Sequence, residues 1–170
     1  RWVGTALPLK EDVRLVAGRG RFIDDLGQPG QLHAAILRSP HAHARIVSID
    51  TRAAAALPGV AAVLTGADVT RLSGPIRPLI PTTAGISDYC LAVDRARYVG
   101  EPVAAVAAVD RATAEDALEL IRVEYDPLLA VVDPEEALKP DAPLLYPELG
   151  TNVVWHDTLT YGDVDGAMAR

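Results

Sequence analysis

The sequence predicts an α+β domain in which a mixed or antiparallel sheet is covered by a few helices. Several short apolar runs end at turn residues, one segment has helical periodicity, and no solenoid or propeller repeat is present. The 170 residues are enough for one ordinary domain that buries its apolar surface without a metal ion or a disulfide. We therefore expect one compact domain as the basic unit.

Four apolar or β-branched runs bounded by turn signals are expected to be strands. They span residues 32–38, 45–50, 60–65 and 103–109. The turn residues Ser39 and Pro40 separate the first two runs. The last run could by periodicity also be a helix, but its length favours a strand. Residues 122–125 form a shorter strand that ends at Asp126 and Pro127.

The residues after Asp110 predict the main helix. The Asp110 side chain suits an N-cap, because its oxygen can accept a hydrogen bond from an otherwise unpaired amide of the first turn. Apolar residues then follow at helical spacing, and acidic residues lie on the opposite side. The apolar positions are Ala114, Ala117, Leu118 and Ile121, and the outward positions are Glu115, Asp116 and Glu119.

Three shorter helices are expected elsewhere. An alanine-rich helix follows Asp50 or Thr51, either of which can cap it, and ends at residues 58–59. Residues 133–134 open a brief helix, because proline suits a first helical turn. Residues 163–170 have the pattern of a capped helix start of about one turn, which is too short to be stable alone. We therefore expect the natural polypeptide to continue.

Two segments are expected to be irregular. Residues 71–88 contain three prolines and two glycines, and a loop of that length is usually functional or disordered. Residues 139–151 are a proline-rich linker. We accordingly divide the chain into a domain at residues 1–152 and, at residues 153–170, a linker with the start of a following domain.

Charge and cysteine content restrict the class of protein. The net charge of −7 argues against a nucleic-acid partner. The charge is uneven: residues 1–52 carry +3 and the remainder −10, so the basic third either faces an acidic partner or is a solvated surface. Cys90 is the only cysteine, which excludes an intrachain disulfide and fits a cytoplasmic location. No apolar run reaches membrane-spanning length.

None of the short motifs is a self-sufficient active site. Gly18 and Gly20 do not continue into a dinucleotide loop, because the third glycine position is Ile23. They are better explained by a turn. Adjacent Asp24 and Asp25 point in opposite directions on an extended chain, so a turn that pairs with arginines or backbone amides explains them better than a general acid/base pair.

The histidines and the nucleophile candidates are also better explained structurally. His41 and His43, two residues apart on one strand face, could supply two metal ligands, but no third ligand is apparent. Ser39 lacks a nucleophile elbow. Cys90 has no basic neighbour in sequence, and a lone cysteine is more often a small core residue.

A series of sequence blocks, in order, resembles the N-terminal hammerhead α/β domain of molybdenum hydroxylase large subunits. This is the family of xanthine dehydrogenase, aldehyde oxidase and aerobic carbon monoxide dehydrogenase. The blocks are residues 18–25, 32–35, 38–50, 57–60, 63–68, 99–105, 125–128 and 148–152. The likeness runs from near residue 4 to the end and is least clear across residues 71–92.

The resemblance implies a module of an oxidoreductase that hydroxylates an aldehyde, a heteroaromatic ring or a similar carbon centre with water. Electrons would pass from molybdopterin-bound molybdenum through [2Fe-2S] clusters to FAD. In the family the cofactor-binding segments and the catalytic glutamate lie downstream of this domain. No catalytic residue and no metal ligand can therefore be placed on this chain, which alone would bind no cofactor and be inactive.

The resemblance also implies partners and surfaces. The partners would be the molybdenum-binding domains of the same large subunit, an iron-sulfur subunit or domain, and a flavin subunit, with no nucleic acid and no membrane insertion. Tyr89, Cys90 and Leu91 would lie near the substrate funnel. Glu101 falls inside a family block and is interpreted as a turn residue. The basic residues expected at domain or subunit contacts are Arg19, Arg21, Arg38 and Arg45.

Two alternatives remain open from the sequence. The first is a small hydrolase that uses His41 and His43 with Asp24 or Asp25. The second is a stand-alone small-molecule-binding domain whose pocket is formed by residues 71–92.

Overall fold

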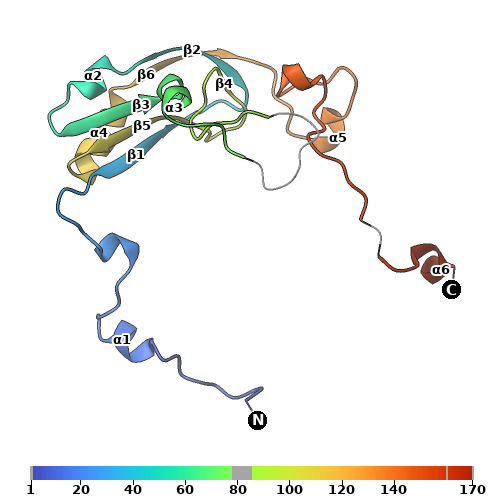
Figure 1. Cartoon of the computed structure of the whole chain (residues 1–170), viewed down its shortest axis with the longest axis horizontal. Coiled ribbons are helices and arrows are strands. Elements are labelled where there is room, and N and C mark those ends of the chain that lie inside the picture. The colour runs from blue at the N-terminus through green and yellow to red at the C-terminus, as the bar shows by residue number, and fades with distance from the viewer. Residues whose placement is uncertain (1, 78–85, 160, 170) are drawn as a thin grey trace. The chain divides into compact units, whose positions relative to one another are not determined.

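The computed structural model describes residues 2–77, 86–159 and 161–169. The chain divides into two compact units, Arg1–Gln31 and Leu32–Arg170 (Figure 1). The predicted division at residue 152 stays a prediction.

The first unit contains two short helical turns, α1 (Asp12–Val16) and η1 (Ile23–Asp25). Neither contains a buried residue. The Asp25 carboxylate accepts a hydrogen bond from the Phe22 amide at 2.9 Å, so Asp25 binds a backbone amide in a turn, as predicted. Gly18 has a φ of +67°, which a residue with a side chain rarely adopts.

The second unit contains two three-stranded sheets, both antiparallel. One has the order β1-β5-β3, with β1 (His33–Arg38), β5 (Pro102–Ala108) and β3 (Val60–Thr65). The other has the order β4-β2-β6, with β4 (Arg95–Ala96), β2 (Ala44–Asp50) and β6 (Arg122–Pro127). The five predicted strands are confirmed with small shifts of their ends, and β4 was not predicted.

The described helices of the second unit are short. They are α2 (Arg52–Ala55), α3 (Gly66–Leu72), α4 (Arg111–Glu119), α5 (Pro134–Ala137), η2 (Pro147–Leu149) and α6 (Val164–Met168). Asp110 caps α4 as predicted, with its carboxylate accepting from the Thr113 amide at 2.8 Å. Among the helices that the structure describes, none is both long and apolar enough to cross a bilayer.

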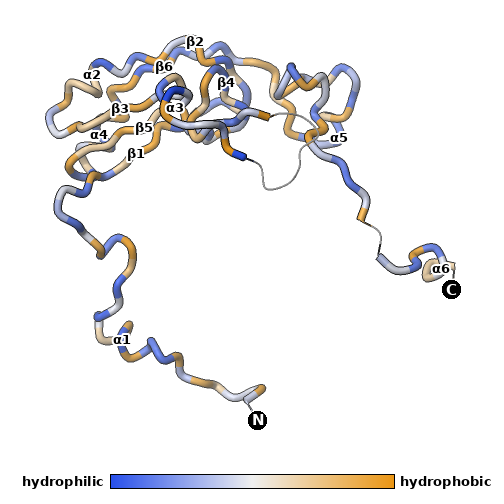
Figure 2. The backbone as a smooth tube through the Cα atoms, in the orientation of Figure 1, coloured by the Kyte–Doolittle hydropathy of each residue, from blue (hydrophilic) through white to orange (hydrophobic). Residues whose placement is uncertain are grey.

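The core lies where α4 packs against the β1-β5-β3 sheet (Figure 1). Ala114 and Ala117 of α4 are fully buried, and the strands of this sheet are mainly apolar (Figure 2). Most side chains between the helix and the sheet are small, so the core is stabilised by close packing of the backbone elements and not by large apolar side chains. The buried cluster consists of Ala54, Ala104, Val106, Ala108, Ala114, Ala117 and Ile121.

The predicted irregular segment at residues 71–88 is wrong at its start, because α3 extends through Leu72. The helix begins with a capping box in which the Asp68 carboxylate accepts from both the amide and the hydroxyl of Thr65, at 2.9 and 2.8 Å. Residues 73–77 and 86–88 have no helix or strand, as predicted. Residues 78–85 lie outside the described part of the chain.

Candidate functional site

A cavity of about 360 Å³ lies in the second unit beside the segment that was predicted to be an irregular loop. Its walls come from the segments on either side of residues 78–85, from the turn between β4 and β5, and from the chain around η2. The lining residues are Ile76, Ile86, Asp88, Tyr89, Tyr98, Glu101, Tyr146 and Val154. The volume lies within the ordinary range for small-molecule sites.

Asp88 joins two of these walls. Its carboxylate accepts a hydrogen bond from the Tyr146 hydroxyl at 2.7 Å, and its carbonyl accepts from the Ile76 amide at 2.7 Å. Burial, together with the hydrogen bond to Asp88 and the charge on that carboxylate, raises the pKa of Tyr146 well above its ordinary value. Tyr146 therefore stays protonated and serves as a hydrogen-bond donor.

Arg97 fixes the segment that carries Tyr146. Its guanidinium lies 4.5 Å from the centroid of the Tyr146 ring, close enough for a cation–π interaction. The Arg97 Nε donates to the Leu145 carbonyl at 3.2 Å, and Nη1 donates to the Arg95 carbonyl at 3.4 Å. A guanidinium held by several partners positions its neighbours more firmly than a single exposed ion pair does.

Asn152 organises the same segment from the other end. Its side-chain oxygen accepts from the Leu145 amide at 3.0 Å, and its Nδ2 donates to the carbonyls of Ala137 and Pro143 at 3.1 and 3.0 Å. The interpretation of residues 139–151 as a linker is therefore wrong. This segment is a folded part of the second unit, because Asn152 satisfies two of its backbone groups and also ties it to the Ala137 carbonyl at the end of α5.

Glu101 is part of a tight turn between β4 and β5. Its carboxylate accepts a hydrogen bond from the Arg97 amide. The turn is joined to the end of β1, because the Ser39 amide donates to the Glu101 carbonyl at 2.9 Å and the Gly100 amide donates to the Ser39 carbonyl at 2.8 Å. Gly100 has a φ of +88°, which favours glycine. Glu101 is therefore a turn residue, as predicted, and also a wall of the cavity.

Burial raises the pKa of Glu101 above its ordinary value of 4.5, against the lowering effect of the Arg97 amide and the Arg97 charge. Between the ordinary and the raised value the folded chain binds more protons than the unfolded chain, so the free energy of unfolding falls as pH rises through that window. We expect Glu101→Gln to remove this decrease of the free energy of unfolding with pH, because glutamine does not ionise. The gain in stability over the wild type should be largest at neutral pH and should vanish below pH 4.5.

Urea denaturation of both proteins between pH 4 and 8 measures this difference. Glu148→Gln, at an exposed side chain of η2, is the control and should change the free energy of unfolding by less than about 0.5 kcal/mol. A Glu101→Gln variant that is less stable than the wild type at neutral pH would show that the carboxylate is net stabilising there.

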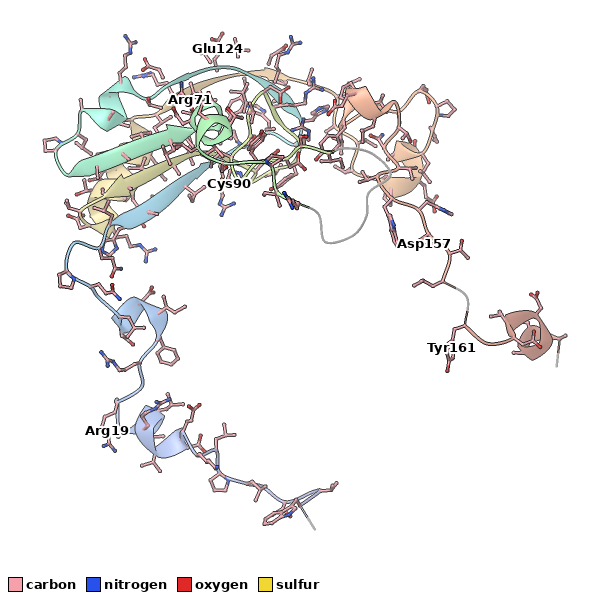
Figure 3. The ribbon with its side chains drawn as sticks, in the orientation of Figure 1. Arg19, Arg71, Cys90, Glu124, Asp157 and Tyr161 are labelled. Atoms are coloured by element: carbon pink, nitrogen blue, oxygen red, sulfur yellow. The ribbon has the colours of Figure 1, made fainter. Side chains whose placement is uncertain are left out.

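The three residues that were predicted to lie near the substrate funnel differ in their exposure to solvent. Tyr89 lines the cavity, Cys90 is exposed (Figure 3), and Leu91 is only 4% exposed. Leu91 therefore packs beneath the loop in this chain. Sequence reasoning did not select Asp88 or Tyr146, because their pairing joins positions 58 residues apart.

The predicted interface arginines differ in how they are held. Arg38 donates to the Gly100 carbonyl at 2.9 Å, and Arg45 forms an exposed ion pair with Asp126 at 3.2 Å. Arg19 (Figure 3) and Arg21 lie in the first unit, and both are exposed. Contact of any of the four with a partner stays a prediction.

The histidines do not form the arrangement that a metal or a hydrolase needs. His41 and His43 precede β2 rather than lying on a strand face, which corrects the prediction. His43 is buried with Nδ1 2.8 Å from the Leu129 carbonyl, and the His41 ring lies against that of Tyr125. Within residues 2–77, 86–159 and 161–169, no group of three or more possible ligands could hold a metal ion.

Two antiparallel sheets, one of them packed against α4, make this chain an α+β domain, as predicted. Residues 17–129 match the family described as aldehyde oxidase and xanthine dehydrogenase, a/b hammerhead domain. This match covers more than half of the sequence. The chain belongs to this family, as its sequence blocks predicted, and the hydrolase and stand-alone alternatives find no support.

Similar proteins include subunits of oxidoreductases. The gamma subunit of the 6-hydroxypseudooxynicotine dehydrogenase complex of Paenarthrobacter nicotinovorans is 44% identical over 99% of this chain and 22% of its own length. The carbon monoxide dehydrogenase large chain of Afipia carboxidovorans is 49% identical over 79% of this chain and 16% of its own. The chain thus spans about a fifth of the length of these relatives.

Solved structures agree with the fold. Quinoline 2-oxidoreductase from Pseudomonas putida 86 superposes with a TM-score of 0.75 at 50% identity, covering 84% of this chain and 18% of its own. The Cu,Mo-CO dehydrogenase in its carbon monoxide reduced state has a TM-score of 0.77 at 40% identity, covering 98% of this chain and 22% of its own. The fold described above is therefore found within known molybdenum hydroxylases, as a part of about a fifth of the matched chains.

Proposed function

We propose that this chain is the hammerhead module of the molybdopterin-binding large subunit of a molybdenum hydroxylase. The observation that carries the proposal is the match of residues 17–129 to the hammerhead family, with relatives that include a xanthine dehydrogenase molybdenum-binding subunit. The parent enzyme oxidises a carbon centre such as an aldehyde or a heteroaromatic ring, with water as the oxygen source. Molybdopterin, [2Fe-2S] clusters and FAD are held by other parts of the complex.

Expression of the native polypeptide together with its genomic neighbours tests this function. The resulting complex should reduce an artificial electron acceptor with at least one substrate from a panel of aldehydes, N-heteroaromatic compounds and carbon monoxide. The 170-residue chain alone should show no turnover. Turnover by the isolated chain would contradict the proposal.

The module also contributes to the substrate funnel in this proposal. Tyr89 and Cys90 present side chains next to the cavity or to solvent, and buried Leu91 supports the loop from beneath. We expect Tyr89→Ala in the complete complex to raise KM several-fold with a smaller change in kcat, because a remote apolar contact contributes to ground-state and transition-state binding alike. Unchanged KM and substrate preference would exclude this role. Leu120→Ala, at the residue that directly follows α4, is the comparison variant.

The first unit supplies a contact surface in this proposal. Apolar side chains of α1 and η1 are largely exposed, among them Val16 at 89% and Ile23 at 87%, and Arg19 and Arg21 lie between them in sequence. Apolar residues flanked by arginine are typical of protein interfaces. The contacts would be with the iron-sulfur subunit or the molybdenum-binding domains.

Reversing the charge at both arginines tests this surface. We expect Arg19→Glu combined with Arg21→Glu to reduce recovery of the partner subunits on an affinity-tagged chain at least tenfold, because a buried charged contact is turned into repulsion. Arg71→Glu reverses the charge at an exposed arginine of the second unit and should leave recovery unchanged. Equal recovery with both variants would rule out a contact role for Arg19 and Arg21.

A further inference from the structure

The cavity that Tyr89 lines is formed by tyrosines, aliphatic side chains and acids. Three phenol rings and three aliphatic side chains form an amphipathic wall, and the two remaining lining residues are acids. The rings belong to Tyr89, Tyr98 and Tyr146, and the acids are Asp88 and Glu101. Among the described residues that line the cavity, none carries a positive charge.

Arg97, which approaches one of these rings, does not line the cavity. Its guanidinium already donates to the carbonyls of Leu145 and Arg95, and it lies 3.8 Å from the carboxylate of Asp94. The hydrogen-bond donors of Arg97 are therefore already bound to residues that support the cavity wall.

Both acids keep the capacity to accept further hydrogen bonds. The Asp88 carboxylate accepts from the Tyr146 hydroxyl, and the Glu101 carboxylate accepts from the Arg97 amide. An ionised carboxylate can accept about four hydrogen bonds. An anionic ligand would meet repulsion from these groups, whereas a cation would be attracted to them and to the faces of the phenol rings.

We propose that this cavity binds a small organic cation, namely a protonated amine or a quaternary ammonium group carried on an apolar body. The ammonium group lies between Asp88 and Glu101, and the apolar body contacts the aliphatic side chains and the tyrosine rings. Burial alone disfavours the charge on Glu101, and a bound cation offsets that cost. The inference concerns binding by this chain, so it does not depend on the molybdenum reaction.

The test uses three probes of similar size: phenethylammonium, neutral 2-phenylethanol and anionic phenylacetate. Each is titrated into the ¹⁵N-labelled 170-residue chain, and amide shifts are followed at Tyr89, Tyr98 and Glu101. We expect saturable shifts with phenethylammonium and at least about tenfold weaker binding of the neutral probe, because cation–π and carboxylate contacts are lost. Phenylacetate should not bind.

Variants connect the binding to the two acids. Asp88→Asn and Glu101→Gln should each weaken phenethylammonium binding about tenfold, while Glu148→Gln, an exposed acid outside the lining, should leave it unchanged. Equal binding of the neutral and cationic probes, or the absence of saturable shifts, would overturn the proposal. A variant whose spectrum loses its dispersion has unfolded. For such a variant, equilibrium dialysis of labelled phenethylamine with the complete complex measures the same loss of binding, and unchanged binding would again overturn the proposal.

Discussion

Replacing Gly66 with alanine is expected to destabilise the chain by about 3 kcal/mol or more, because the added methyl group has no space. A Cβ at this buried position would overlap the carbonyl oxygen of Ala92 and lie 2.6 Å from the Cα of Val93. These atoms are backbone, and the Ala92 amide is itself bound to the Pro102 carbonyl of β5 at 2.7 Å. The loop that follows Leu91 therefore cannot move away without losing its attachment to the sheet.

Gly74 provides the matched control. It lies shortly after α3, and a Cβ built there meets nothing within 4 Å. Gly74→Ala should leave stability unchanged or raise it by up to about 1 kcal/mol, because alanine restricts the unfolded chain. Guanidinium denaturation of the two variants and the wild type measures the contrast. Similar stability of all three would show that α3 does not pack against residues 92–93 as described.

Replacing Arg97 with methionine is expected to cost about 2–3 kcal/mol, since charge-assisted hydrogen bonds and a cation–π contact are lost together. The Arg97 side chain is only 14% exposed, so water replaces these contacts poorly. The loss should be concentrated in the segment that carries Tyr146. Hydrogen exchange at the Leu145 amide, which is normally bound to Asn152, should become faster by at least tenfold.

Arg71→Met tests whether the effect arises from position or merely from the loss of an arginine. Arg71, on α3 (Figure 3), pairs with Asp68, but its side chain is 75% exposed. Exposed ion pairs contribute little, so the expected loss is below about 1 kcal/mol. Equal losses for Arg71→Met and Arg97→Met would contradict the view that Arg97 holds the cavity wall.

The strands and α4 could be predicted because their signals are local. Runs of apolar residues mark β3 and β5, and Asp110 followed by alanines at helical spacing marks α4. Helix α3 was missed although Thr65 and Asp68 have the spacing of a capping box. Gly66, the first residue of the helix, is a poor helix former and weakened the helical signal. A glycine is required there because the backbone of Ala92 and Val93 lies close to it, and this contact depends on the tertiary structure.

The cavity could not be predicted for a different reason. Asp88 and Tyr146 are 58 positions apart, and neither lies in a motif whose spacing indicates chemistry. Asn152 did fall inside a sequence block typical of the family, but its role in holding residues 137–145 depends on a fold that brings three backbone groups to one side chain. Sequence patterns therefore predicted most strands and helices of this domain, but they did not predict the contacts between its loops.

Metal and flavin analysis of the native complex tests the central proposal most directly. The native polypeptide that contains this sequence would be purified with its partner subunits from the source organism or an intact operon, and molybdenum, iron and flavin would be quantified against the chain. We expect all three in fixed stoichiometric ratios. A folded complex that lacks molybdenum, iron and flavin would contradict the assignment of this chain to a molybdenum hydroxylase.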